Sequence, residues 1–129
     1  HSGLGIVLAA SGRYEQALEE IEIAKRLSPQ DFFLWNFYQV EGWANFSLGR
    51  YEKVVEAARH SLRLRPQNVY AHLQLIASLD ALERYDDAKA GLEDLRRSIP
   101  SLSTDELLLA PSVKEQYLAA LERAGWSDP

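Results

Sequence analysis

Cysteines and histidines, which could act as metal ligands or catalytic groups, are few in this sequence of 129 residues, and those present are widely spaced. There is no cysteine, so thiolate metal ligands, cysteine nucleophiles and disulfide bonds are excluded. The three histidines, His1, His60 and His72, lie far apart, and none has a second metal ligand at helical spacing. We therefore expect no metal site.

Two further patterns that can carry chemistry are incomplete. Gly3 and Gly5 suggest a phosphate-binding loop, but neither a third glycine nor a P-loop lysine follows them. Glu19, Glu20 and Glu22 could act as paired carboxylates, but the predicted helix places them on an exposed face. No serine stands in a nucleophile-elbow motif. The sequence therefore predicts no catalytic residue, no cofactor and no enzymatic activity.

Composition and charge narrow the class of partner. The chain is 47% hydrophobic and 26% charged, with a net charge of −5, and residues 67–129 hold six basic against eleven acidic residues. The most basic segment, residues 50–65, fits the solvated side of one helix with cations near its C-terminal end. A nucleic-acid binder usually has a net basic domain, so we expect no nucleic-acid partner.

Membrane insertion is also not expected, because no apolar run approaches the roughly 20 residues of a membrane-spanning helix. There is no signal-peptide pattern, which favours a cytoplasmic location. The sequence contains no methionine, so we expect it to be a fragment whose native start lies outside it.

A six-residue pattern occurs three times in the sequence. It indicates the helical elements that must position the candidate residues. Residues 12–17 read GRYEQA, residues 49–54 read GRYEKV and residues 83–88 read ERYDDA. Their tyrosines are 37 and then 34 residues apart, and each is followed 15 residues later by a proline. A fixed period of this length is typical of repeat proteins.

Each period has the features of two antiparallel helices. Gly12 and Gly49 stand where a first helix must end, and glycine accepts the left-handed conformation of a helix C-cap. In each second helix the apolar residues keep the spacing of one helical face, and the closing proline ends that helix. We expect Tyr14, Tyr51 and Tyr85 to wedge between the two helices of their units.

These residues resemble the tetratricopeptide repeat (TPR), whose pattern has a Leu-Gly pair, a later Gly-x-Tyr-x-x-Ala, a small residue and a closing proline. The first unit fits almost completely. The second has Glu41 for the usual leucine, and the third has Ile76 and Glu83 in place of glycines. The resemblance implies an all-α fold, an α-α superhelix in a single domain over residues 1–129, with repeats over residues 1–31, 32–66 and 67–100.

After Pro100 the repeat stops. Ser103 with Glu106, and Ser112 with Glu115, each resemble a capping box that opens a helix. We expect a short helix and a C-terminal capping helix within residues 101–126, ended by Gly125, with Trp126 packing back on it. Repeat arrays commonly cover their apolar end with such an element.

The TPR resemblance implies that the first helix of each unit lines a concave groove that holds peptides. Carried over residue by residue, it selects Ser2, Ile6, Ala9, Asn36, Gln39, Trp43, Phe46, Tyr70, Leu73, Ala77 and Asp80. These positions include no lysine or arginine, so we expect no carboxylate-clamp ligand of the chaperone type. The middle of the groove is aromatic, and aromatic residues often anchor interfaces. Alternatively, they pack against a neighbouring helix or the chain's own C-terminal segment.

Three functions remain open at this point. The first is a non-catalytic module that binds a peptide or helix of a protein partner in the groove. The second is a homodimer formed by the aromatic segment before the second glycine, which contains Phe32, Phe33, Trp35 and Phe37. The third is a regulatory arm, because the C-terminal run loosely resembles bacterial TPR segments that follow class III nucleotide cyclase domains or winged-helix regulators.

Overall fold

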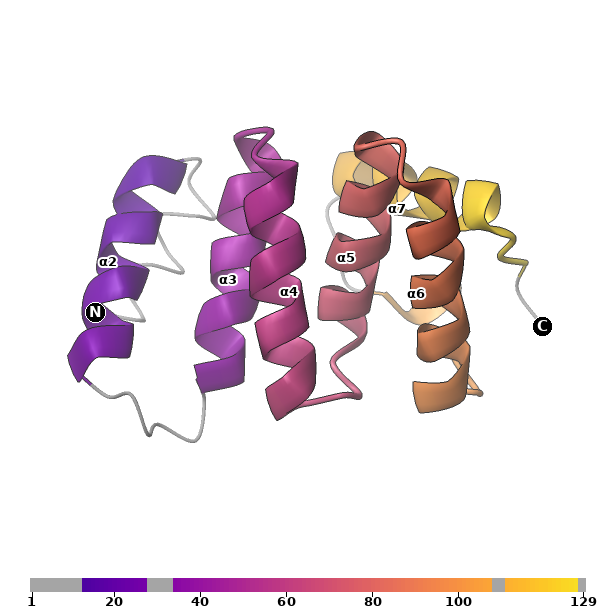
Figure 1. Cartoon of the computed structure of the whole chain (residues 1–129), viewed down its shortest axis with the longest axis horizontal. Coiled ribbons are helices and arrows are strands. Elements are labelled where there is room, and N and C mark those ends of the chain that lie inside the picture. The colour runs from indigo at the N-terminus through magenta and orange to yellow at the C-terminus, as the bar shows by residue number, and fades with distance from the viewer. Residues whose placement is uncertain (1–12, 28–33, 108–110, 128–129) are drawn as a thin grey trace.

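The computed structural model describes residues 13–27, 34–107 and 111–127. Within these ranges the chain forms six α-helices and no strand: α2 (Tyr14–Leu27), α3 (Leu34–Ser47), α4 (Tyr51–Leu64), α5 (Val69–Ala81), α6 (Tyr85–Ser98) and α7 (Pro111–Ala124). A 3₁₀ turn, η1 (Thr104–Glu106), precedes α7. Helices α2 to α6 pack one after another as a row (Figure 1). The expected all-α superhelix is confirmed.

The tight turns within the repeat units are closed by the same backbone geometry. Gly49 has a φ of 74°, and Glu83, at the equivalent place one unit later, has a φ of 60°. In both turns the next amide donates a hydrogen bond of 2.9 Å across the end of the helix, from Arg50 to the Asn45 carbonyl and from Arg84 to the Leu79 carbonyl. The turn is thus retained at Glu83, although its side chain makes the left-handed conformation costly.

Small and apolar residues at equivalent positions of the second helices form the core. They are Ala17, Ile21 and Ala24 in α2, Val54, Ala58 and Ser61 in α4, and Ala88, Leu92 and Leu95 in α6, all of them buried. The predicted helical stripes are therefore confirmed. The alanines and the serine among them let neighbouring helices approach closely.

The predicted tyrosine wedge fits the second unit, where the partly buried Tyr51 of α4 meets Phe46 of α3 edge to face. Tyr14 is partly buried against the cluster that includes Val40 of α3, but the first helix of its own unit lies outside the described residues, so its wedge stays a prediction. Tyr85 is 52% exposed, so the expectation was wrong for the third unit. The reason is that α7 does not stack beside α6 in the way that α3 and α5 stack beside the units before them.

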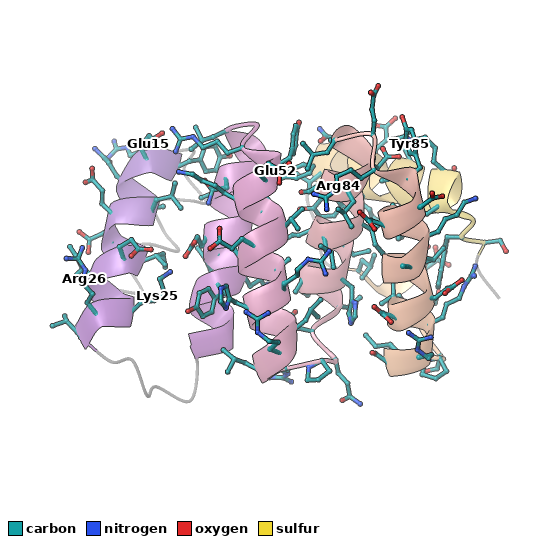
Figure 2. The ribbon with its side chains drawn as sticks, in the orientation of Figure 1. Glu15, Lys25, Arg26, Glu52, Arg84 and Tyr85 are labelled. Atoms are coloured by element: carbon teal, nitrogen blue, oxygen red, sulfur yellow. The ribbon has the colours of Figure 1, made fainter. Side chains whose placement is uncertain are left out.

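Successive units are joined at one edge of the array by arginines of the repeated turn. Arg50 forms an ion pair with Glu15 of the preceding unit, and Arg84 lies 3.6 Å from Glu52 of the unit before it. Figure 2 shows Glu15, Glu52, Arg84 and Tyr85 along this edge. Each of the two ion pairs adds little to stability, because all of their side chains are at least 40% exposed: Arg50 and Glu15 in one pair, Arg84 and Glu52 in the other.

The C-terminal helix α7 lies across α5 and α6 (Figure 1). Its Tyr117 ring meets that of Phe46 near the end of α3. It begins at Pro111, a residue that suits the first turn because its missing amide hydrogen would have no partner there. Ser112 therefore lies inside the helix. It is not the N-cap that its capping-box pattern had suggested. Gly125, with a φ of 114°, ends the helix as expected, and Trp126 packs against the core.

Candidate peptide-binding surface

Helix α3 carries three of the predicted groove residues on one side. Gln39, Trp43 and Phe46 follow each other at intervals of four and three residues, which is the spacing of one helical face. All three are partly buried. Trp43 packs against the cluster formed by residues of α2 and Val40. Its indole is thus fixed from one side while part of its surface stays accessible.

The equivalent side of α5 is covered by the chain itself. Leu73 and Ala77 are buried in the core that also contains Tyr117, Ala120 and Leu121 of α7. Tyr70 is partly buried against the same core. The two buried residues present no surface to a ligand, because α7 lies across α5. In the third unit the predicted groove positions Leu73 and Ala77 are therefore covered by the C-terminal helix.

An ion pair fixes the end of α5 to α7. The Nε atom of Arg123 donates at 3.0 Å to both carboxylate oxygens of Asp80, and Nη2 donates at 2.5 Å to Oδ2. The Asp80 side chain is 9% exposed, whereas that of Arg123 is 57% exposed. The hydrogen bonds and charge of Asp80 raise the pKa of Arg123. The Asp80 carboxylate is therefore already bound by Arg123 of α7.

An aromatic contact joins α7 to α3. The rings of Phe46 and Tyr117 meet edge to face, with centroids 5.3 Å apart, and Phe46 makes a similar contact of 5.5 Å with Tyr51. Tyr117 is almost fully buried, and its burial raises the pKa of the phenol. Phe46 thus stands where the surface of α3 meets α7, and it connects the two.

Gln74 holds α3 and α5 at a short distance from each other. Its Nε2 donates a hydrogen bond of 3.0 Å to the carbonyl of Gln39, and its side chain lies against Gly42. A β-carbon at Gly42 would lie 2.4 Å from Oε1 of Gln74. The absence of a β-carbon at Gly42 thus leaves room for the amide of Gln74 to approach α3 closely.

Glu41, which replaces the usual leucine of the second unit, forms part of a charged cluster. Its Oε2 lies 2.5 Å from Nζ of Lys25, which also lies 2.9 Å from Glu22 and 4.6 Å from the ring centre of Tyr38. Burial alone would lower the pKa of Lys25, but the hydrogen bonds and charges of the two glutamates outweigh it and raise the pKa. Lys25 stays protonated and serves as an ion-pair partner between α2 and α3.

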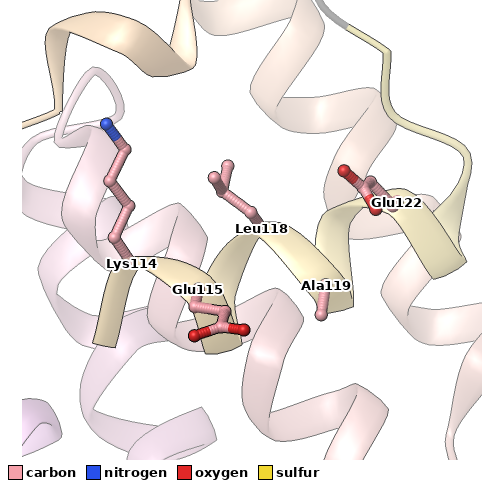
Figure 3. Close-up of a pocket in the computed structure, with 5 residues that line it drawn as sticks. All are labelled: Lys114, Glu115, Leu118, Ala119 and Glu122. Atoms are coloured by element: carbon pink, nitrogen blue, oxygen red, sulfur yellow. The ribbon is translucent and has the colours of Figure 1, made fainter. Parts of the chain in front are cut away.

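A hollow of about 500 Å³ lies along the outward side of α7. Its described lining is Lys114, Glu115, Leu118, Ala119 and Glu122, which lie along the length of the helix (Figure 3). This surface was not predicted from the sequence, because the apolar stripe of residues 113–121 indicates only the side that faces the core. The spacing of Glu115, Leu118 and Glu122 by three and four residues could have indicated a second face.

The remaining predicted site residues cannot be placed as side chains. Ser2, Ile6, Ala9, Phe32 and Phe33 lie outside the described residues. Trp35, Asn36 and Phe37 belong to α3, but their side chains are also outside the described part. The roles assigned to these eight residues stay predictions.

Potential metal ligands do not cluster in the described ranges. There, no group of three or more histidines, aspartates and glutamates is placed to hold a metal ion. None of the helices α2 to α7 combines the length and apolar character that crossing a membrane requires.

Comparison with known proteins gives likenesses among solved structures and no match by sequence. No protein-family model matches the sequence, and no curated protein matches it. Among solved structures, a thermophilic TPR protein of Thermus thermophilus aligns with a TM-score of 0.45 and 22% identity. The alignment covers 95% of this chain and 84% of that protein.

Proposed function

We propose that this chain is a non-catalytic protein-interaction module. It binds a peptide or helix of a partner protein on the side of α3 that carries Gln39, Trp43 and Phe46. The observation that carries this proposal is the placement of Trp43 and Phe46. Both are partly exposed on one side of α3, and both are held in place by packing, Trp43 against α2 and Phe46 against α7. Rigid aromatic side chains bury a large area at little entropic cost and are common interface anchors.

The position of α7 supports a site limited to the α3 side. A ligand cannot reach Leu73 or Ala77 while α7 covers them. The accessible surface then runs from Gln39 past Trp43 to Phe46, where α7 forms a wall. The amide of Gln39 can both donate and accept hydrogen bonds, which suits the backbone of a bound segment.

The charges of this surface do not favour a ligand held by its terminal carboxylate. The predicted groove positions contain no lysine or arginine, and Arg123 beside them is engaged by Asp80. Binding then depends mainly on apolar burial at the two aromatic residues.

The test is selection of peptides from a displayed random library on the intact chain, followed by affinity measurement by fluorescence anisotropy. We expect Trp43→Ala to weaken the selected peptides about ten-fold or more, as expected for loss of an interface anchor. Tyr85→Ala, which removes an aromatic that is 52% exposed at the start of α6, is the matched control and should leave affinity unchanged. Thermal unfolding of both variants shows whether they remain folded.

Two results would count against the proposal. One is a library that yields no binder. The other is a set of binders with the same affinity for the wild type and for a folded Trp43→Ala variant.

A further inference from the structure

We infer that the α3 surface binds an extended, proline-rich segment of the partner protein, whose backbone carbonyls accept hydrogen bonds from Gln39 and Trp43. This inference rests on the proposed function, and it chooses between the peptide and the helix that the proposed function leaves open. It starts from the hydrogen-bonding groups that remain unpaired on this side of α3.

Two side chains of this surface have N–H groups without a partner among the described residues. The indole Nε1 of Trp43 forms no hydrogen bond there and is open to solvent, whereas the unpaired Nε1 of Trp126 is buried. The side-chain amide of Gln39 is also unpaired in the described ranges. Both groups can therefore exchange water for a carbonyl of a ligand.

The acceptors and charges near these donors are already engaged. The backbone carbonyl of Gln39 accepts a hydrogen bond from Gln74, and the Asp80 carboxylate is bound by α7. Glu41 forms an ion pair with Lys25. Apart from the amide oxygen of Gln39, the described residues of this surface thus offer donors to a ligand and no unpaired charge. A neutral segment that has carbonyls but few N–H groups is the complement, and proline, which lacks the backbone N–H, provides it.

A helical ligand cannot use these donors through its backbone. The carbonyls of an α-helix accept hydrogen bonds from amides four residues later, and only those of the last turn are free. The polyproline II conformation has no internal hydrogen bonds, so its carbonyls stay available along the whole segment. The unpaired donors of α3 therefore favour an extended ligand.

The length of the surface fits one turn of such a ligand. Gln39 and Phe46 are seven residues apart, a rise of about 10 Å along α3. One turn of polyproline II contains three residues and rises about 9 Å. A proline-rich turn can thus cover this length, with apolar rings against Phe46 and a carbonyl near the indole N–H of Trp43, in the manner of proline-rich recognition on aromatic surfaces.

The experiment follows the indole N–H signals of the intact, ¹⁵N-labelled chain by NMR during titration with N-acetylated decaproline. The three tryptophans give three such signals, which single Trp→Phe variants assign. Decaproline adopts the polyproline II conformation and has no backbone N–H between its residues. The comparison ligand is a helical, alanine-rich peptide with leucines along one side.

We expect the indole proton of Trp43 to move downfield as it donates to a carbonyl of decaproline. The signal of Trp126 should stay in place, because its N–H is buried. The helical peptide should leave both signals unchanged.

Variants separate the donors from the apolar surface. Gln39→Glu retains the shape of the side chain but replaces a donor by an acceptor, and it should bind decaproline about three- to ten-fold more weakly. Gln16→Glu makes the same change at an exposed position of α2 and is the matched control, with the affinity of the wild type. Thermal unfolding shows whether both variants are folded.

Three results would overturn the inference. One is a Trp43 signal that decaproline does not move, and another is an equal affinity of the wild type and folded Gln39→Glu for decaproline. The third is a Trp43 signal that moves with protein concentration alone, which would assign the surface to a second copy of the chain.

The proposed function is tested separately by the peptide library. Selected peptides that depend on Trp43 but are helical when bound, as measured by circular dichroism, would preserve the proposed function and overturn the choice of an extended ligand. A library without any peptide that depends on Trp43 would reject the function itself.

Discussion

His72 is a buried side chain in which ionisation is linked to folding. Its Nε2 lies 2.7 Å from the carbonyl of Pro66, and its Nδ1 is buried without a partner among the described residues. Burial lowers the pKa of His72, although the Pro66 carbonyl and the charge of Asp94 oppose this effect. Protonation would place a proton on an atom with no acceptor, so the folded protein favours the neutral ring.

This gives a pH dependence with a definite sign. The unfolded chain binds the proton more readily than the folded chain, so stability falls as the pH drops below about 6.5. We expect the Tm to decrease between pH 7.5 and pH 5.5, and this decrease to be smaller in His72→Gln. Calorimetry checks this, with Leu73→Ala as a control that destabilises α5 but retains the histidine. An unchanged pH dependence in His72→Gln would contradict the assignment.

The two left-handed turn residues differ in side chain but share one conformation. A β-carbon at Gly49 would meet no atom within 4 Å, so any cost of adding one comes from the positive φ. Glu83 already bears that cost. We expect Gly49→Ala to lower the free energy of unfolding by about 1 kcal/mol and Glu83→Gly to raise it by about 0.5–1 kcal/mol.

Chemical denaturation measures both changes. Glu83→Ala is the matched control, because it removes the charge but retains the β-carbon, and it should give no gain. A similar gain from Glu83→Ala and Glu83→Gly would mean that charge, not backbone conformation, limits this turn.

At the scale of the elements, the contact between α3 and α5 depends on Gly42. We expect Gly42→Ala to lower the free energy of unfolding by about 1–3 kcal/mol, because the new methyl group would displace Gln74 and break its hydrogen bond to Gln39. The same substitution in a Gln74→Ala background should cost less than half as much, since the obstructing side chain is gone.

A double-mutant cycle by urea denaturation tests this coupling. Gly91→Ala is a useful comparison, because a β-carbon there would lie 3.2 Å from Cγ1 of Ile76, a milder approach that is independent of Gln74. Equal costs of Gly42→Ala in the two backgrounds would show that Gln74 does not set the spacing.

Helix α7 has two functions as an element. It covers α5 through Tyr117, Ala120 and Leu121, and this burial completes the core of the third unit. It also covers the predicted groove positions Leu73 and Ala77, whereas those of α3 that the structure describes stay partly exposed. The exposed side of α6, which includes Asp87, Glu93 and Asp94, is polar and leaves no apolar face for another helix to cover.

At the scale of the whole molecule, the aromatic residues that open the second unit leave a homodimer as the alternative to a separate partner protein. If the chain self-associates through them, light scattering behind a sizing column will show a concentration-dependent dimer. Phe33→Glu should convert this dimer to a monomer, whereas Trp43→Glu should leave it intact, because Trp43 belongs to the proposed partner-binding surface.

A monomer at every concentration would contradict the homodimer. A dimer broken by Trp43→Glu instead would mean that a second copy occupies the α3 surface. Each outcome therefore changes which of the two surfaces is assigned to a partner.

The sequence by itself determined the helical hairpins and their order. The turn glycines, the apolar spacing of the second helices and the closing prolines act within one unit of about 35 residues, so their effect can be read locally. The same local information indicated Gly125 as a C-cap and placed Gln39, Trp43 and Phe46 on one side of a helix.

Only the tertiary structure decided where α7 lies and what it covers. The contacts that fix it, Phe46 with Tyr117 and Asp80 with Arg123, join residues 71 and 43 positions apart in the chain. The pairing of Glu41 with Lys25, and the close approach of Gln74 to Gly42, also depend on distances between helices. A repeat pattern specifies that helices stack, but it does not specify these distances, because they arise from side-chain packing between units.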